Sequence, residues 1–285
     1  MKMTSPDMQA IREQVSNALV EDLGGELNAA NDITANLIDE SVNAKATIIT
    51  REPCVVCGIA WANQAFALID ESVSLTWHVE DGDKVEADTV LVSLEGSARA
   101  ILTAERTALN FLQTLSATAT VTAFYAKFLA GSNTKILDTR KTLPGLRYAQ
   151  KYAVRCGGGQ NHRVGLFDAF LIKENHIFSC GNIEKAVSRA KSMMPGKPVE
   201  VEVENLEELE QALSAGADIV TNISTHGRTR PADIYWLQRN LRTADPNAPI
   251  WFTRAPRRRA NGSRGRIWGS RRACLRRPSP RLCDP

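Results

Sequence analysis

The stretch VEVEVENLEELEQALSAGADIV, residues 199–220, decides the fold class because its periodicity changes twice. Valine and glutamate alternate over 199–204, and a period of two is typical of a β-strand. A helical pattern follows over 206–215, and the apolar run ADIVTNI at 217–223 is again typical of a strand. The order strand, helix, strand predicts parallel strands joined by a helical crossover.

The same alternation extends upstream of this stretch. KILD at 135–138 and AFLIK at 169–173 are typical of strands, and IEKAVSRAKSMM at 183–194 is typical of a helix. Alternating strands and helices at this spacing predict an α/β barrel.

The first hundred residues show a different pattern of predicted helices and strands. Apolar residues at spacings of three and four predict a helix over 7–22, and a short helix is expected at 61–70. Four β-like runs lie around it, and together they predict a small α/β sandwich domain. The runs are AKATIIT at 44–50, CVVCGIA at 54–60, SLTWHVE at 74–80 and TVLVSLEG at 89–96.

A long helical pattern over 103–130 connects the two parts. Its expected apolar stripe comprises Leu109, Leu112, Leu115, Val121, Phe124 and Phe128. We therefore expect an N-terminal α/β sandwich domain at 1–110, an incomplete α/β barrel domain at 111–225 and a separate segment at 226–285.

The composition is that of an ordinary globular protein, with 43% hydrophobic and 24% charged residues, which excludes disordered and fibrous classes. The N-terminus MKMTSPDMQAIREQ lacks the apolar core of a signal peptide, and no run approaches the roughly 18 apolar residues of a membrane span. These features predict a cytoplasmic protein, in which the six cysteines are reduced thiols. Cys54 and Cys57 have zinc-like spacing, but their apolar setting favours buried thiols.

Charge is distributed unevenly along the chain. Residues 1–225 carry 20 basic and 29 acidic residues, a net charge of −9, whereas 226–285 carry 15 arginines, no lysine and three acids, a net charge of +12. Such a basic block is typical of a nucleic-acid-binding or disordered arm. The alternative is that it does not continue the domain naturally.

Cations gather where strands are expected to end. In parallel α/β folds the loops after the strands converge at one edge, so these cations predict a pocket for a multiply charged anion. Glu200, Glu202 and Glu204 share one strand face, and carboxylates there suit a hard cation such as Mg²⁺ or developing positive charge. The five cations are Arg140, Lys141, His162, Arg163 and Lys173.

Simpler interpretations of these charged residues also stay open. Single basic residues near turns are usually surface charges, and the glutamates would also suit an exposed edge strand. The glycine run 157–159 lacks the spacing of a phosphate-binding loop, so we interpret it as a loop that lets the backbone approach a ligand.

Long strings of the sequence resemble the quinolinate phosphoribosyltransferase family of NAD biosynthesis, over roughly residues 8–220. They are EDLGGELN and NDIT within 21–34, LTAERTALNFLQTLS at 102–116, LDTRKTLPGLR at 137–147, KYAVRCGGGQNHRVGLFDAFLIKENHI at 151–177 and VEVEVENLEELEQALSAGADIV at 199–220. The resemblance implies transfer of phosphoribosyl from phosphoribosyl pyrophosphate to quinolinate with decarboxylation, a Mg²⁺ cofactor and a homodimer with shared active sites.

The resemblance also implies residue roles. Arg106 would reach the pocket of the partner subunit, and Thr139 opens the substrate loop. Lys141 and Glu202 would meet phosphoribosyl pyrophosphate as the catalytic residues. The carboxylates of quinolinate would be held by Arg140, His162, Arg163 and Lys173.

The resemblance stops near Thr221. Ile223 stands where the family carries an aspartate for the ribose and metal, so the metal ligands are unknown, and glycine-rich loops for the 5′-phosphate are absent from the sequence. A shifted reading frame from near Thr221 would explain this break together with the arginine-rich composition. The alternatives are a catalytically impaired member, a paralogue for another anionic aromatic, or a protein whose basic tail binds nucleic acid, since arginine with interleaved tryptophan suits single strands.

Overall fold

The computed structural model describes residues 7–222 together with Trp251–Phe252. The expectations for the basic segment 226–285 therefore lie outside the described residues, apart from that two-residue strand. No helix in the described ranges is long and apolar enough to cross a membrane.

The first helix matches its prediction. α1 spans Met8–Asp22, and the Asp7 carboxylate caps it by accepting hydrogen bonds from the N–H groups of Gln9 and Ala10. Its apolar face, Ile11, Val15 and Leu19, is completely buried. Two short 3₁₀ turns follow, at Ala29–Asn31 and Ala35–Leu37.

An antiparallel sheet forms the N-terminal part in the order β1-β5-β3. β1 spans Asn43–Ile49, β3 spans Ser74–Trp77 and β5 spans Val90–Ser97, which confirms three of the four predicted runs. The prediction for the remaining run, CVVCGIA at 54–60, is wrong for most of its length. Only Cys54–Val55 forms a strand, β2, which pairs with β4 at Lys84–Val85, and Gly58 then begins a helix.

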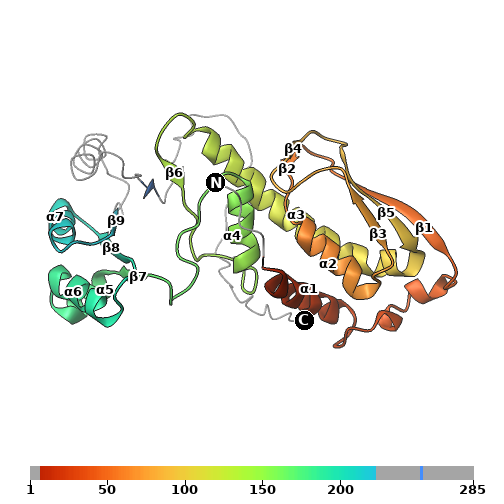
Figure 1. Cartoon of the computed structure of the whole chain (residues 1–285), viewed down its shortest axis with the longest axis horizontal. Helices are drawn as coiled ribbons and strands as arrows, with labels where there is room; N and C mark the ends of the chain where they lie inside the picture. Colours follow the sequence, from red (N-terminus) through yellow and green to blue (C-terminus); the bar gives the residue numbers. More distant parts are fainter. Residues whose placement is uncertain (1–6, 223–250, 253–285) are drawn as a thin grey trace, which may run out of the picture. The chain divides into compact units, whose positions relative to one another are not determined.

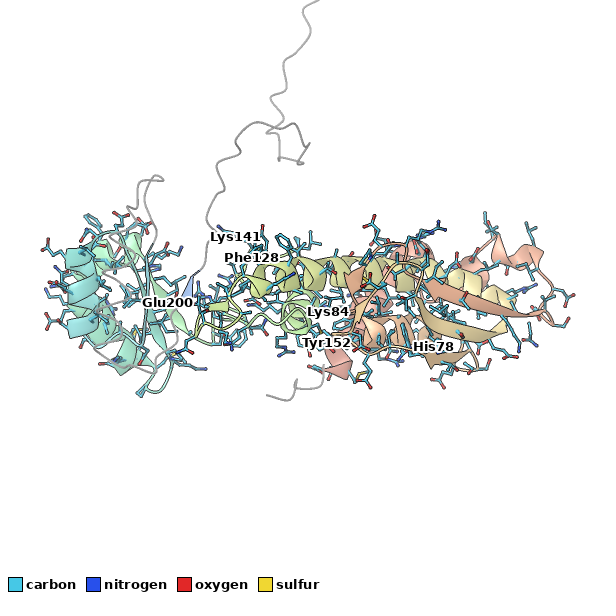
Figure 2. The ribbon with its side chains drawn as sticks, turned by 90° about the horizontal axis from the view of Figure 1, so that it is seen from above. His78, Lys84, Phe128, Lys141, Tyr152 and Glu200 are labelled. Carbon is cyan, nitrogen blue, oxygen red and sulfur yellow. The ribbon has the colours of Figure 1, made fainter. Side chains whose placement is uncertain are left out.

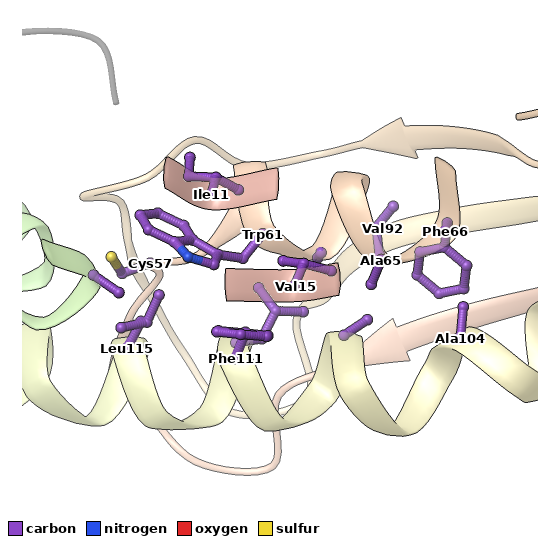
Figure 3. Packing of buried hydrophobic residues seen from close by; sticks show 14 of the residues in the cluster. Ile11, Val15, Cys57, Trp61, Ala65, Phe66, Val92, Ala104, Phe111 and Leu115 are labelled. Atoms are coloured by element: carbon purple, nitrogen blue, oxygen red, sulfur yellow. The ribbon is translucent and has the colours of Figure 1, made fainter. Parts of the chain in front are cut away.

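Helices α2 and α3 pack together and with the sheet (Figure 1). α2 spans Ile59–Ile69 and α3 spans Ala98–Lys127, so the long helix begins five residues earlier than predicted. Trp61 of α2 lies toward Phe111 and Leu115 of α3 in the core, and Phe66 of α2 lies toward Ala104 of α3 (Figure 3).

The predicted stripe of the long helix is correct only in its first half. Leu112 and Leu115 are buried, whereas Val121, Phe124 and Phe128 are 56%, 58% and 65% exposed. The buried face continues instead through Ala119 and Thr122, because there α3 faces a helix that packs too closely for large side chains.

That close neighbour is α4, Arg147–Cys156, which the sequence analysis did not predict. A Cβ on Gly157 would lie 2.3 Å from the Ala119 carbonyl oxygen, and one on Gly159 would lie 2.7 Å from Val154. In the described chain the backbone of the glycine run thus approaches helix α3, and its approach to a ligand stays a prediction.

The second part contains the parallel strands. β7 at Phe170–Ile172, β8 at Val199–Val203 and β9 at Ile219–Asn222 form a sheet in that order, all parallel. Three helices lie along one face of it (Figure 1): α5 at Glu174–Cys180, α6 at Ile183–Met193 and α7 at Leu206–Ser214. β6, Lys135–Ile136, pairs in parallel with β10, Trp251–Phe252.

These parallel pairs are the ones that an α/β barrel requires, and each part has its own hydrophobic core. Closure of the barrel and the domain boundaries at 110 and 225 stay predictions.

Candidate functional site

Strand β8 separates its valines from its glutamates. Val199, Val201 and Val203 pack into the core beneath α6 and α7, so by the period of two Glu200 and Glu202 point to the opposite face. β8 lies between β7 and β9, which excludes the edge-strand alternative. Glu204 follows the end of the strand and is exposed, so the third predicted carboxylate does not share this face.

Lys173 lies directly after β7 and pairs with Glu202. Leu171 is in register with Glu200 and Ile172 with Val201, so the next residue along β7 comes opposite Glu202. The Lys173 Nζ is 2.9 Å from Glu202 Oε2, with the lysine side chain 43% and the glutamate side chain 11% exposed. The Lys173 side chain thus stays partly exposed while it is paired with Glu202.

His162 meets the other carboxylate of the strand. Its Nε2 forms a hydrogen bond with Glu200 Oε2, and the Glu200 side chain is 3% exposed. A carboxylate this deeply buried is tolerated because it has a partner of opposite or switchable charge. The sequence analysis placed Glu200 on this face as a possible partner for a cation, but did not pair it with His162.

A network of hydrogen bonds holds the segment that carries His162. The segment runs beside the chain after β6, where the Gln160 N–H donates to the Ile136 carbonyl at 2.8 Å and the Asp138 N–H donates to the Gln160 carbonyl at 3.2 Å. The Asp138 carboxylate accepts from the His162 N–H at 2.8 Å and from Asn161 Nδ2 at 2.6 Å. Lys151 of α4 completes the network with an ion pair to Asp138 at 2.5 Å.

The loop after β6 carries the remaining cations of the motif. The Thr139 hydroxyl accepts from the Lys141 N–H at 3.1 Å, and the Lys141 side chain is exposed (Figure 2). The Nε of Arg140 is buried and has no hydrogen-bond partner within the described ranges. A buried guanidinium donor in that state is costly, and an anionic ligand would satisfy it.

Arg163 lies in a loop that Asp168 holds. The Asp168 carboxylate accepts from the N–H groups of Val164 at 2.6 Å and Gly165 at 3.1 Å. Partial burial raises the pKa of Asp168, but these hydrogen bonds and the charge of Arg163 outweigh it, so that the pKa lies below its ordinary value of 3.8.

Arg106 lies on α3 and its side chain is exposed. No hydrogen bond or ion pair joins it to Arg140, His162 or Lys173 in the part of the chain that the structure describes. This placement is what a residue would need if it served another subunit.

The described residues thus bring His162 and Lys173 to the carboxylates of one strand, and they link His162 to the loop of Arg140 and Lys141 through Asp138. Lys151 was missed by the sequence analysis. The pattern gave no signal for it, because Ala149, Tyr152 and Ala153 share one face of the helix and position 151 lies nearly opposite, so the burial of Lys151 depends on where α4 packs.

Comparisons with known proteins show the family of the chain. A family model described as the N-terminal domain of quinolinate phosphoribosyl transferase matches residues 32–116, and the model of its C-terminal domain matches residues 118–234. The second match extends beyond Thr221, where we placed the break, and ends before the arginine-rich residues after 250.

Two curated relatives show the same similarity. A probable carboxylating nicotinate-nucleotide pyrophosphorylase of Bacillus subtilis is 39% identical over 211 residues, which are 74% of this chain and 71% of the relative. The carboxylating nicotinate-nucleotide pyrophosphorylase of Mycobacterium leprae is 37% identical over 219 residues, covering 75% of each chain.

Solved structures agree with the fold. The nicotinate-nucleotide pyrophosphorylase of Francisella tularensis superposes with a TM-score of 0.76 at 47% identity, covering 82% of both chains. The structure from Ehrlichia chaffeensis gives a TM-score of 0.74 at 33% identity and covers 89% of this chain and 93% of that one. The predicted two-domain α/β fold and the predicted resemblance are confirmed, and the chain belongs to the quinolinate phosphoribosyltransferase family.

Proposed function

We propose that this protein transfers the phosphoribosyl group of phosphoribosyl pyrophosphate to quinolinate, releasing pyrophosphate and carbon dioxide and giving nicotinate mononucleotide for NAD biosynthesis. The proposal makes it a glycosyltransferase of the carboxylating nicotinate-nucleotide diphosphorylase type. The observation that carries it is the set of cations beside β8, since a family of this chemistry needs cations for a dicarboxylate substrate.

The quinolinate pocket consists of Arg140, His162, Arg163 and Lys173. The buried Nε of Arg140, which has no hydrogen-bond partner in the described ranges, and the ammonium group of the partly exposed Lys173 side chain are the proposed donors to the anion. Two carboxylates on adjacent ring carbons would use both, and an arginine fork binds a carboxylate in a bidentate manner.

Lys141 and Glu202 are the proposed groups for phosphoribosyl pyrophosphate, with Thr139 on the same loop as Lys141. Lys141 is exposed and supplies a point charge for phosphate oxygens. Glu202 is bound to Lys173, which brings the group for the ribose next to a group for quinolinate. This adjacency favours attack of the ring nitrogen on the ribose C1.

The chemistry then balances without a covalent enzyme intermediate. The lone pair of the pyridine nitrogen forms the bond to C1, and the bond from C1 to pyrophosphate breaks with its electrons leaving on the pyrophosphate. The ring is now a pyridinium, which stabilises the electron pair left on C2 when the carboxylate departs as carbon dioxide. A proton from solvent then completes C2.

Mg²⁺ stays part of the proposal, although the described residues do not build a metal cage for it. No group of three or more histidine, cysteine or acidic side chains is arranged to hold a metal within 7–222. Glu200 and Glu202 are already paired with His162 and Lys173. We therefore derive no step through the ion.

We also propose a cytoplasmic homodimer in which Arg106 enters the site of the partner subunit, with no role in nucleic-acid or membrane binding. The exposure of Arg106 on α3 supports the shared site.

The test uses the purified full chain with quinolinate and phosphoribosyl pyrophosphate. We expect nicotinate mononucleotide and carbon dioxide to form in equal amounts, and the Lys173→Met variant to lose quinolinate binding. A chain that neither binds quinolinate nor forms the nucleotide would contradict the proposal.

A further inference from the structure

One buried ion pair has no role in the proposed reaction. Lys151 is 3% exposed, and the Asp138 side chain that it contacts is 8% exposed. Removal of two charges from water is unfavourable unless the pair has good geometry and its other hydrogen bonds are satisfied. The pair therefore needs an explanation beyond stability.

Both members of the pair bind the backbone of one residue. Asp138 Oδ1 accepts the His162 N–H at 2.8 Å, and Lys151 Nζ donates to the His162 carbonyl at 3.0 Å. The pair thus satisfies both polar backbone groups of His162.

Asn161 reinforces the same arrangement. Its Nδ2 donates to Asp138 Oδ2 at 2.6 Å and to the Lys151 carbonyl at 2.8 Å. Both carboxylate oxygens of Asp138 are therefore used, and the segment is attached to α4 by side chain and backbone alike. A charged network in which each member has a partner is rigid.

The segment needs such fixation because glycines flank it. Gly157, Gly158 and Gly159 precede Gln160, and Gly165 follows Val164. Glycine allows many backbone conformations, so the side-chain bonds restrict residues 160–164. The imidazole of His162 can then reach Glu200 on β8.

Neither charge of the pair reaches β8 directly. Throughout the described ranges, no hydrogen bond or ion pair joins Lys151 or Asp138 to Glu200, Glu202 or Lys173. Any influence of the pair on the carboxylates of β8 must therefore act through the segment of His162.

We propose that Lys151 and Asp138 are positioning residues, which clamp the His162 peptide and hold its imidazole at the substrate pocket. The part of this inference that concerns the substrate rests on the proposed function, because that function assigns His162 to quinolinate. The clamp itself is independent of the substrate.

The first measurement is amide hydrogen exchange of the full chain without ligand. Lys151→Met removes the donor to the His162 carbonyl but leaves Asp138 unpaired, so the neutral double variant Lys151→Met/Asp138→Asn guards against unfolding. We expect exchange at His162 to accelerate about tenfold or more in either variant, because the clamp no longer restricts the segment.

Tyr152→Phe is the matched control. Tyr152 is the next residue of α4, also buried, and its hydroxyl donates to Asp81 at 2.9 Å rather than to the His162 segment. This control perturbs the same helix, and we expect His162 exchange to remain unchanged. Exchange that does not respond to loss of Lys151, or that responds equally in the control, would overturn the clamp.

The second measurement separates the two substrates by isothermal titration calorimetry. We expect Lys151→Met, which leaves Asp138 and the loop of Lys141 unchanged in sequence, to bind quinolinate about tenfold more weakly and phosphoribosyl pyrophosphate with less than about a threefold change, because only quinolinate is proposed to contact His162. Lys151→Arg should recover much of the affinity, since arginine can still pair with Asp138. Equal losses for both substrates would overturn the positioning role.

The two measurements distinguish the inference from the proposed function. If the unmodified chain bound no quinolinate, the proposed function would be wrong, while hydrogen exchange would still decide the clamp.

Discussion

At the scale of single residues, Asp81 shows how one carboxylate can join distant segments. Its Oδ1 accepts from the N–H groups of Gly58 at 2.8 Å and Ile59 at 3.2 Å, at the start of α2, and its Oδ2 accepts from the Tyr152 hydroxyl of α4. Burial raises the pKa of Asp81 above its ordinary value of 3.8, and the hydrogen bonds only partly oppose this. Asp81 therefore stabilises the fold through the hydrogen bonds that its oxygen atoms accept rather than through its negative charge.

Asp81→Ala should lower the free energy of unfolding by about 2 kcal/mol, because it removes a helix cap and leaves the Tyr152 hydroxyl without an acceptor. Asp81→Asn keeps an acceptor for the helix and should cost less. Urea denaturation followed by circular dichroism measures both variants, and an equal loss in both would contradict this account.

The raised pKa of Asp81 also sets the direction in which the free energy of unfolding changes with pH. The folded state holds the Asp81 proton to a higher pH than the unfolded state, so the contribution of Asp81 decreases as the pH rises from 3.8 through the raised pKa. In Asp81→Asn this component should be missing from the plot of unfolding free energy against pH.

The contribution of Asp168 to stability changes with pH in the opposite direction. Its pKa is lowered, so its stabilising contribution is present above pH 3.8 and disappears as the pH falls through the folded value. Asp168→Asn should weaken the loop of Arg163 at pH 7 and resemble the unmodified chain near pH 2. Limited proteolysis across 163–168 at the two pH values measures this, and cleavage that is equally fast in both proteins at pH 7 would refute it.

Elements with strong periodicity were predictable from the sequence. The alternating valines and glutamates of β8 gave both its strand and its two faces, and the spacing of Ile11, Val15 and Leu19 gave α1. Short elements were not predictable: the two-residue strands β2 and β4 depend on pairing between segments 30 residues apart. α4 was not predicted, and its buried residues include Lys151, a residue type that a hydrophobic pattern does not count.

The sequence predicted which types of residue form the candidate site, but not which of these residues contact each other. The position after a strand indicated Lys173, since parallel strands end at a common edge, whereas His162 precedes β7 in the chain. Their assignment to Glu202 and Glu200 required the strand register, and the role of Lys151 required knowledge of where α4 packs. Such long-range contacts leave no pattern along the chain.

The contact between α3 and α4 depends on the absence of a side chain at Gly157. A methyl group there would lie 2.3 Å from the Ala119 carbonyl oxygen and 2.6 Å from Thr122 Cβ. Gly157→Ala should therefore cost about 3 kcal/mol of unfolding free energy, the upper range for overpacking.

Gly158→Ala is the control for that prediction. Gly158 has a φ of +83°, but its nearest neighbour would be 3.9 Å away, so only backbone strain of about 1 kcal/mol is expected. Thermal unfolding should rank Gly157→Ala as the more destabilised protein. The reverse order would show that packing against α3 is not the constraint.

At the scale of the whole molecule, the sequence after residue 221 limits the expected rate of nicotinate mononucleotide formation. Ile223 stands where the resemblance implies an aspartate, and the implied glycine-rich loops for the 5′-phosphate are absent from the sequence. Loss of groups that bind the phosphates should reduce nicotinate mononucleotide formation by at least about a hundredfold relative to the Francisella tularensis relative.

Quinolinate binding should persist, because its proposed residues all precede the break. A chimera that carries the corresponding C-terminal residues of that relative after residue 220 should keep quinolinate binding and recover turnover. Turnover of the present chain equal to that of the relative would contradict the prediction. The nucleotide sequence across codons 215–230 would show whether a second reading frame encodes the family pattern.

The shared-site proposal makes the last prediction. Arg106→Ala and His162→Ala should each abolish quinolinate binding, although Arg106 makes no described contact with the pocket residues of its own chain. If each site of a dimer combines Arg106 of one subunit with His162 of the other, a mixed dimer contains one doubly damaged site and one intact site. Random exchange of subunits makes half of the dimers mixed, so the mixture should regain about a quarter of the binding capacity. Calorimetric stoichiometry measures this after the subunits have been exchanged. If both residues served the same subunit, no mixture could contain an intact site, and the capacity would stay at zero.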